Sequence, residues 1–203
     1  GAPNDMFGNS IDMAETKMLV GAYMDSNSNG HFAGAAYLFS NSELGWQEAT
    51  KLLSADGQAS DSFGWDVDIS IDRAIVGSPY SSLPSLPQAG SAYVFELSGL
   101  VVTQQAKLVA EFPATGDTFG KTVAVDGGIV AVGANWVDDV GAADVGAAFL
   151  FEVQTGNWTR SQTILAEDRS ALDEFGSSVA LSGETLMIGA PRDDNPSGTN
   201  SGS

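Results

Sequence analysis

Short apolar runs bounded by polar turns recur along the whole chain, and the second quarter shows them most clearly. Residues 67–71 alternate apolar and polar side chains, and residues 74–78 form a short apolar run. Residues 90–96 combine β-branched and aromatic side chains, and residues 101–109 supply a fourth run after a tight turn. Runs of this length and alternation predict four β-strands, and no segment makes a convincing helix.

The same series of runs returns at a constant step. Phe-Gly occurs at Phe7, Phe63, Phe119 and Phe175, and the differences 63−7, 119−63 and 175−119 are each 56. Two further glycine markers keep this step: Gly21, Gly77, Gly133 and Gly189, and then Gly34, Gly90, Gly146 and Gly202. Four antiparallel strands in each radially repeated unit describe a propeller blade. We therefore expect an all-β fold, a β-propeller of four-stranded antiparallel blades in 56-residue repeats.

The repeated residues have structural explanations. Small residues beside Gly77, Gly133 and Gly189 suit inner strands that crowd around a central axis, where backbones approach closely. The Phe of each Phe-Gly marker is expected to pack between neighbouring blades, because buried aromatic side chains dominate core energetics.

We interpret residues 1–203 as one propeller region whose units start near residues 7, 63, 119 and 175. Four full units would need 4×56 = 224 residues, so the 203 residues make about three and a half units and the last is incomplete. An open arc of blades exposes strand edges. We expect the chain to be part of a longer protein; strands from another chain, or a partner that caps a smaller arc, are the alternatives.

Charge excludes some partners. The chain has 26 Asp and Glu against 8 Lys and Arg, a net charge of −18. Such a chain repels phosphate backbones and anionic lipids, so we expect no nucleic acid partner. No apolar run approaches the ~20 residues of a membrane span, so we expect no membrane insertion. The absence of cysteine excludes disulfides and thiolate metal sites.

The loop after the first Gly-Ala marker has oxygen donors at alternating positions. It places Asp25, Asn27 and Asn29 before Gly30, and calcium prefers several hard oxygen ligands of this kind. An EF-hand is excluded, because the position of its bidentate Glu holds Ala36. We expect calcium as a cofactor here. The alternative is an ordinary turn, since Asp, Asn and Gly also stabilise solvent-exposed turns.

A second candidate calcium loop lies at the same phase of the fourth unit, because 193−25 = 168 = 3×56. Its expected ligands are Asp193, Asn195 and Ser197.

Other candidates are aromatic residues and a sequon. Trp65 and Trp136 lie at positions where the other units have no Trp, which favours a ligand or partner contact. Asn157 begins an Asn-Trp-Thr sequon at an expected hairpin turn, a glycosylation site if the chain is secreted by a eukaryote. His31 is the only histidine and has no G-x-S-x-G elbow beside it, so we do not expect an enzyme.

The segments FGSSVA (residues 175–180), IGAP (residues 188–191) and GSAYVF (residues 90–95) carry a resemblance. The chain resembles the FG-GAP repeats of the integrin α-subunit head and of their bacterial and algal relatives. That resemblance implies a propeller with calcium-binding hairpin loops, placed outside the cell or on its surface. The expected function is a non-catalytic, calcium-braced binding or adhesion module for a protein or glycan partner. The alternatives are an architectural subunit that packs against neighbouring subunits, and an accessory domain of a secreted enzyme.

Overall fold

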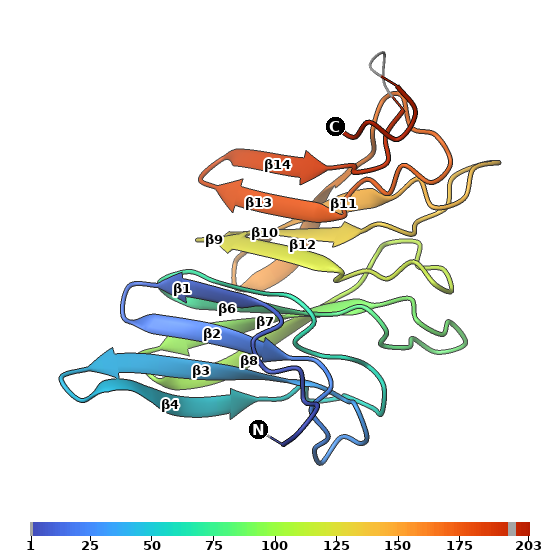
Figure 1. Ribbon diagram of the computed structural model, residues 1–203. Coiled ribbons are helices and arrows are strands. Elements are labelled where there is room, and N and C mark those ends of the chain that lie inside the picture. The colour runs from blue at the N-terminus through green and yellow to red at the C-terminus, as the bar shows by residue number, and fades with distance from the viewer. Residues whose placement is uncertain (1, 195–197) are drawn as a thin grey trace.

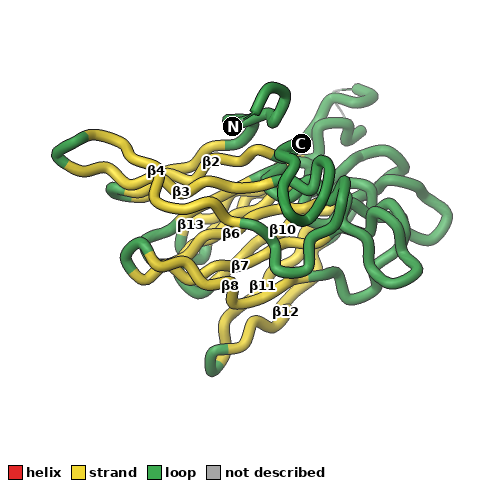
Figure 2. The backbone as a smooth tube through the Cα atoms, turned by 90° about the horizontal axis from the view of Figure 1, so that it is seen from below, coloured by secondary structure: helices red, strands yellow, loops and turns green. Residues whose placement is uncertain are grey.

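The computed structural model describes residues 2–194 and 198–203, and these residues form strands and loops without any helix (Figures 1 and 2). Within these residues, three sheets have four strands each and one has two. The first two sheets contain β1 (Ile11–Ala14), β2 (Lys17–Ala22), β3 (Ala35–Ser42), β4 (Gly45–Leu52), β5 (Val67–Ile69), β6 (Arg73–Ser78), β7 (Ser91–Ser98) and β8 (Val101–Leu108). The others contain β9 (Thr122–Asp126), β10 (Ile129–Ala134), β11 (Ala147–Gln154), β12 (Asn157–Ile164), β13 (Ser178–Ser182) and β14 (Thr185–Gly189).

Each sheet is an antiparallel meander in chain order, which confirms the predicted blades. The four runs predicted in the second unit become β5 to β8. A register shift recurs at the same phase of the third strand, next to Phe39, Phe95 and Phe151. The first strands β1, β5, β9 and β13 pack against one another in succession, so they are the innermost strands of their blades.

The glycine markers form the joint between blades. Gly34 has a φ of +85°, and a Cβ on it would lie 2.0 Å from the carbonyl oxygen of Phe63. Gly21 faces the same joint, because its Cβ would lie 2.3 Å from the carbonyl oxygen of Gly64. Phe63 N donates to Ala33 O at 2.9 Å across the joint. The 56-residue recurrence of glycine therefore reflects the close backbone approach of each blade to the next.

The aromatic core lies between blades, as the Phe-Gly markers predict. Phe63 is 0% exposed, and its ring meets those of Tyr93 at 5.4 Å and Phe95 at 6.1 Å. Phe119 repeats this packing one blade later. Phe7 occupies the same position in the first blade and is 50% exposed, because the described residues place no blade before it.

Aspartates connect the innermost strands across the blades. Asp66 accepts from Ser10 Oγ of the first unit at 2.7 Å and from Val123 N of the third at 2.9 Å. Asp12 accepts from Ile69 N at 2.9 Å, and Asp68 accepts from Val125 N at 2.5 Å. These carboxylates satisfy backbone amides that the short inner strands leave unpaired between blades.

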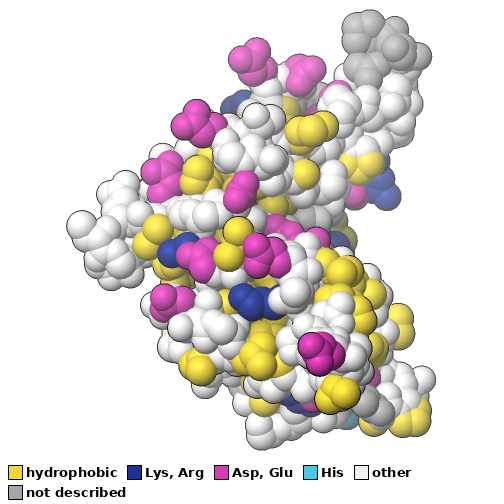
Figure 3. Space-filling model, turned by 90° about the vertical axis from the view of Figure 1, so that its left-hand side faces the viewer, with side chains coloured by type: hydrophobic (Ala, Val, Ile, Leu, Met, Phe, Trp, Pro, Cys, Tyr) yellow, Lys and Arg dark blue, Asp and Glu magenta, His cyan; other side chains and the backbone are white. Residues whose placement is uncertain are grey.

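The two ends of the inner strands differ. The hairpin turns within the strand pairs lie on the left of Figure 1, and the longer loops after β2, β6 and β10 gather on the opposite side, as Figure 2 also shows. We call these the hairpin side and the loop side. Acidic side chains, with Lys and Arg between them, are scattered over the hairpin side (Figure 3).

Candidate functional site

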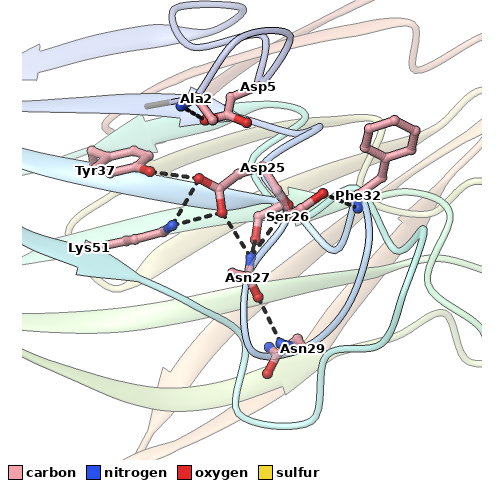
Figure 4. A network of polar contacts seen from close by, with 10 residues as sticks. Ala2, Asp5, Asp25, Ser26, Asn27, Asn29, Phe32, Tyr37 and Lys51 are labelled. Carbon is pink, nitrogen blue, oxygen red and sulfur yellow. Dashed lines mark hydrogen bonds and ion pairs between the residues drawn. The ribbon is translucent and has the colours of Figure 1, made fainter.

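The first candidate calcium loop is organised around a buried ion pair. Asp25 follows β2 and is 3% exposed. Lys51 Nζ donates to both of its carboxylate oxygens, at 2.7 and 2.8 Å, from the end of the outer strand β4. Tyr37 Oη donates to Asp25 Oδ2 at 2.7 Å from the adjacent strand β3 (Figure 4).

The two asparagines complete this network with donors as well as acceptors. Asn27 Nδ2 donates to Asp25 Oδ1 at 3.1 Å and to Gly34 O at 2.8 Å, while its Oδ1 accepts from Asn29 N at 2.9 Å. Asn29 Nδ2 donates to Ser54 O at 2.8 Å, away from the carboxylate. Asn27 therefore closes the loop on itself and Asn29 ties it to Ser54, an arrangement that an ordinary turn can adopt.

The first loop does not fit calcium in this arrangement. Calcium needs six to eight oxygens around one point, whereas Asp25 is surrounded by an ammonium, a phenol and an amide that all donate to it. Burial alone would raise the pKa of Asp25, but the hydrogen bonds from Lys51, Tyr37 and Asn27 outweigh it and hold that pKa below its ordinary value. In residues 2–194 and 198–203, no group of three His, Cys, Asp or Glu side chains could hold a metal.

The same pair of side chains recurs one unit later with a different carboxylate. Tyr93 and Lys107 lie 56 residues after Tyr37 and Lys51. Tyr93 Oη donates to Asp56 Oδ1 at 2.9 Å, and Lys107 Nζ donates to Asp56 Oδ2 at 2.7 Å. The Asp56 side chain is 53% exposed, so this second pair lies at the surface.

The second candidate calcium loop is described in part. Asp193 is buried, and its carbonyl oxygen accepts from Gly202 N at 3.0 Å. Asn195 and Ser197 lie outside the described residues, so calcium binding in this loop stays a prediction.

A calcium titration separates the two loops. The chain is first treated with a chelator, and calcium is then added to about 2 mM, roughly the level that weak extracellular sites require. We expect any resulting rise in melting temperature to persist in Asp25→Asn. The reason is that Lys51 already neutralises Asp25. Scanning calorimetry of Asp25→Asn and the matched variant Asp193→Asn measures this. A calcium shift that vanishes in Asp25→Asn and survives in Asp193→Asn would contradict the expectation.

A hollow on the loop side brings all four units together. It measures about 250 Å³, and its lining consists of Asn9, Ser10, Trp65, Asp66, Lys121, Thr122 and Ser177. Asn9, Trp65, Lys121 and Ser177 occupy one position of the repeat, directly after Phe-Gly, and the other three occupy the next position. We call this space the loop-side hollow.

Trp65 forms one wall of the loop-side hollow within a group of aromatic rings. Its ring lies 4.6 Å from that of Tyr23 and 5.3 Å from that of Tyr80, centroid to centroid. Lys121 Nζ lies 3.8 Å from the Trp65 centroid and 5.8 Å from that of Tyr80, within cation–π distance. Burial lowers the pKa of Lys121.

Trp136 is placed differently. It lies in the loop after β10, 56 residues after Tyr80, and is 39% exposed. Among the described aromatic residues, the ring contacts around Trp65 do not include it. The structure therefore assigns Trp65 to the hollow and leaves Trp136 as a separate exposed side chain on the loop side.

The sequon lies on a hairpin turn, as predicted. Asn157 is the first residue of β12 and pairs with Gln154 across Thr155 and Gly156, which have φ of +49° and +83°. Two successive positive φ values are typical of a type I′ hairpin turn. The Asn157 side chain is exposed, so an attached glycan would extend into solvent, and glycosylation stays a prediction.

Sequence reasoning missed the two lysines that define these places. Lys51 lies 26 residues after Asp25, so no local motif joins them, although its recurrence as Lys107 was visible at the 56-residue step. Lys121 stands at the repeat position of Trp65, and aligning the units at Phe-Gly would have paired the two. His31, by contrast, is an exposed loop residue whose ring lies 3.7 Å from that of Phe32, centroid to centroid, at an interplanar angle of 48°.

Comparison with known proteins gives a family. The crystal structure of Saccharomyces cerevisiae Sqt1 matches with a TM-score of 0.48 and 11% identity over 84% of this chain and 38% of that chain. No curated protein matches. Within the described part of the chain, no helix is long and apolar enough to cross a membrane. A family model described as FG-GAP repeat matches residues 1–39, 46–95, 102–151 and 158–203. The chain belongs to the FG-GAP repeat family.

Proposed function

We propose that this chain is a non-catalytic binding module that receives its partner on the loop side, at the hollow next to Trp65. One observation carries the proposal. Phe-Gly is identical in all four units, yet the next residue is Asn9, Trp65, Lys121 or Ser177. Residues that hold the blades together are kept constant, while the residues that line the hollow differ in chemistry. Such differences suit recognition of one asymmetric ligand better than they suit packing.

The FG-GAP family and the charge of the chain support an extracellular or cell-surface role with a protein or glycan partner. FG-GAP repeats are typical of surface proteins, and a net charge of −18 disfavours nucleic acids. The ion pair of Asp25 and Lys51 braces the first loop in place of calcium in this proposal. Calcium remains proposed for the fourth loop alone.

An architectural role is the second candidate, and the first blade favours it. Ile11 and Met13 are 55% and 54% exposed, whereas Val67 and Ile69, at the same positions one unit later, are 4% and 5% exposed. A face with the composition of a blade interface suits packing against a neighbouring subunit. In that case loss of this face, for example in Ile11→Lys, would abolish assembly.

Substituting Trp65 tests the binding proposal. We expect that the wild-type chain, applied to an array of glycans and extracellular proteins, retains at least one ligand, and that Trp65→Ser lowers its affinity at least tenfold. Removal of a buried aromatic contact commonly costs ~2 kcal/mol in binding. Trp46→Ser is the matched control, because Trp46 lies on the outer strand β4. Equal losses in both variants, or no retained ligand, would refute a binding role for the hollow.

A further inference from the structure

The ammonium of Lys121 lies against aromatic rings at the wall of the loop-side hollow. Within the described residues its Nζ lies over the rings of Trp65 and Tyr80 and makes no ion pair or hydrogen bond. Glu174 acts on it through electrostatics only, and that carboxylate is paired with Arg192 at 2.7 Å. A partly desolvated cation at the wall of an open hollow gains most from an anionic ligand, and a carboxylate or phosphate can supply the charge.

The polar side chains around Lys121 present acceptors to the hollow. Thr122 Oγ1 donates to Gly176 O at 2.9 Å, and Ser177 Oγ donates to Glu174 O at 2.7 Å. Asn9 Nδ2 donates to Trp65 O at 2.9 Å, which leaves its Oδ1 as an acceptor. A hydroxyl group whose proton already forms a hydrogen bond within the protein can only accept a hydrogen bond from a ligand. The hollow therefore combines one cation, several neutral acceptors and an aromatic wall with the Asp66 carboxyl, whose pKa is raised by burial and which already accepts from Ser10 Oγ and Val123 N.

A ligand that matches this arrangement carries one negative charge, several hydroxyl donors and an apolar ring face. A sugar acid has all three, because its carboxylate pairs with an ammonium, its hydroxyls donate, and its C–H face packs against an aromatic ring. A phosphate or an acidic peptide side chain offers the charge without the hydroxyl donors. A hollow of about 250 Å³ admits a single sugar ring, and the net charge of −18 opposes a polyanion.

We propose that the loop-side hollow binds a carboxylate-bearing sugar, with Lys121 pairing the carboxylate and Trp65 packing against the ring. This assignment rests on the proposed binding function and specifies its ligand class. It also gives each repeat a distinct part: the first and fourth units supply acceptors, the second the aromatic wall and the third the cation.

Calorimetric titration with D-glucuronate and D-glucose tests the assignment. We expect the wild-type chain to bind glucuronate at least tenfold more tightly than glucose, and Lys121→Met to remove this preference. Lys121→Gln is the second variant should the first unfold, and thermal melts establish folding of each. Lys107→Met is the control, because that lysine pairs with Asp56 away from the hollow. It should keep the preference.

Three outcomes overturn the proposal: equal binding of glucose and glucuronate, a glucuronate preference that survives in both Lys121 variants, or equally tight binding of N-acetylaspartate amide or inorganic phosphate. The last would show recognition of charge without a sugar. If glucuronate fails while another ligand still depends on Trp65, the sugar acid is wrong and the binding function stands. If no ligand depends on Trp65, both are wrong.

Discussion

Replacing Lys51 by Met will lower the free energy of unfolding by about 3 kcal/mol, because the change leaves the Asp25 carboxylate buried without its cation. The Asp25 side chain is 4% exposed and that of Lys51 is 33% exposed, so water can replace the ammonium only in part. Met preserves most of the aliphatic volume of Lys, which restricts the loss to the charge and its two hydrogen bonds. Urea unfolding followed by circular dichroism at pH 7 measures the difference.

Lys107→Met is the internal control for this prediction. Lys107 has the equivalent tyrosine neighbour and the same repeat position, but its partner Asp56 is 53% exposed. A surface ion pair of this kind contributes about 0–1 kcal/mol. The double variant Asp25→Asn with Lys51→Met removes both charges and should recover more than half of the loss. Equal effects of Lys51→Met and Lys107→Met, or no recovery in the double variant, would show that the pair does not brace the loop.

The pair also shows how far a local motif could lead. The spacing of Asp25, Asn27 and Asn29 predicted calcium, with an ordinary turn as the alternative, and in the structure Asn27 Oδ1 accepts from the backbone of Asn29 within the loop. The side chains that surround Asp25 come from strands β3 and β4, which contact the loop only after the meander forms. A cation contributed by the chain itself has no signature in the loop sequence.

The blades were predictable for the opposite reason. The joint between them repeats every 56 residues, so the same steric demand acts on Gly21, Gly77 and Gly133 and becomes visible as a period. A recurring aspartate keeps the same step. Asp5, Asp61, Asp117 and Asp173 keep the same step, and each carboxylate accepts from the backbone amide three residues earlier, just before Phe-Gly. In so acidic a chain, one recurring carboxylate does not stand out.

The loop-side hollow was only half visible in the sequence. Trp65 attracted notice as an aromatic residue without a counterpart in the other units, but its neighbours Tyr23 and Lys121 come from two other units. Contacts that cross between blades depend on the rotation from one blade to the next, which the strand pattern does not specify. The same limit applies to the inner strands, where Asp68 is one of the polar residues of the alternating run 67–71.

Asp68 and Asp12 in fact lie against each other on neighbouring inner strands. Burial, followed by a hydrogen bond with Asp12, raises the pKa of Asp68 to about 8. Asp68 also lines a second hollow, of about 470 Å³, on the hairpin side. Its lining includes the acidic residues Glu15, Asp72 and Asp126, so the charge around Asp68 is acidic as well. The folded chain thus holds a proton on Asp68 at a pH where the unfolded chain has lost it.

We expect Asp68→Asn to stabilise the protein by about 2 kcal/mol at pH 8.5, a value well below the full shift because solvent reaches part of the group. The Asn side chain can accept from Val125 N and donate to Asp12, as the protonated carboxyl does. In the wild-type chain, the contribution of Asp68 is fully present below its ordinary pKa of 3.8 and is lost as the pH rises through about 8. At pH 4 the two proteins should therefore be equally stable.

Urea unfolding of both proteins between pH 4 and pH 9 measures this difference. The pKa values of Asp25 and Asp56 are lowered, so these carboxylates lose their contribution to stability only at a pH below this range. Both residues are present in both proteins, so their effects cancel in the comparison. In an Asp12→Asn background the gain from Asp68→Asn should shrink, because Asp68 then faces an amide and retains less of its raised pKa. A gain that is the same at pH 4 and pH 8.5 would place its origin in packing rather than in the shared proton. A loss at every pH would mean that the carboxylate itself, through Val125 N, holds the inner strands together.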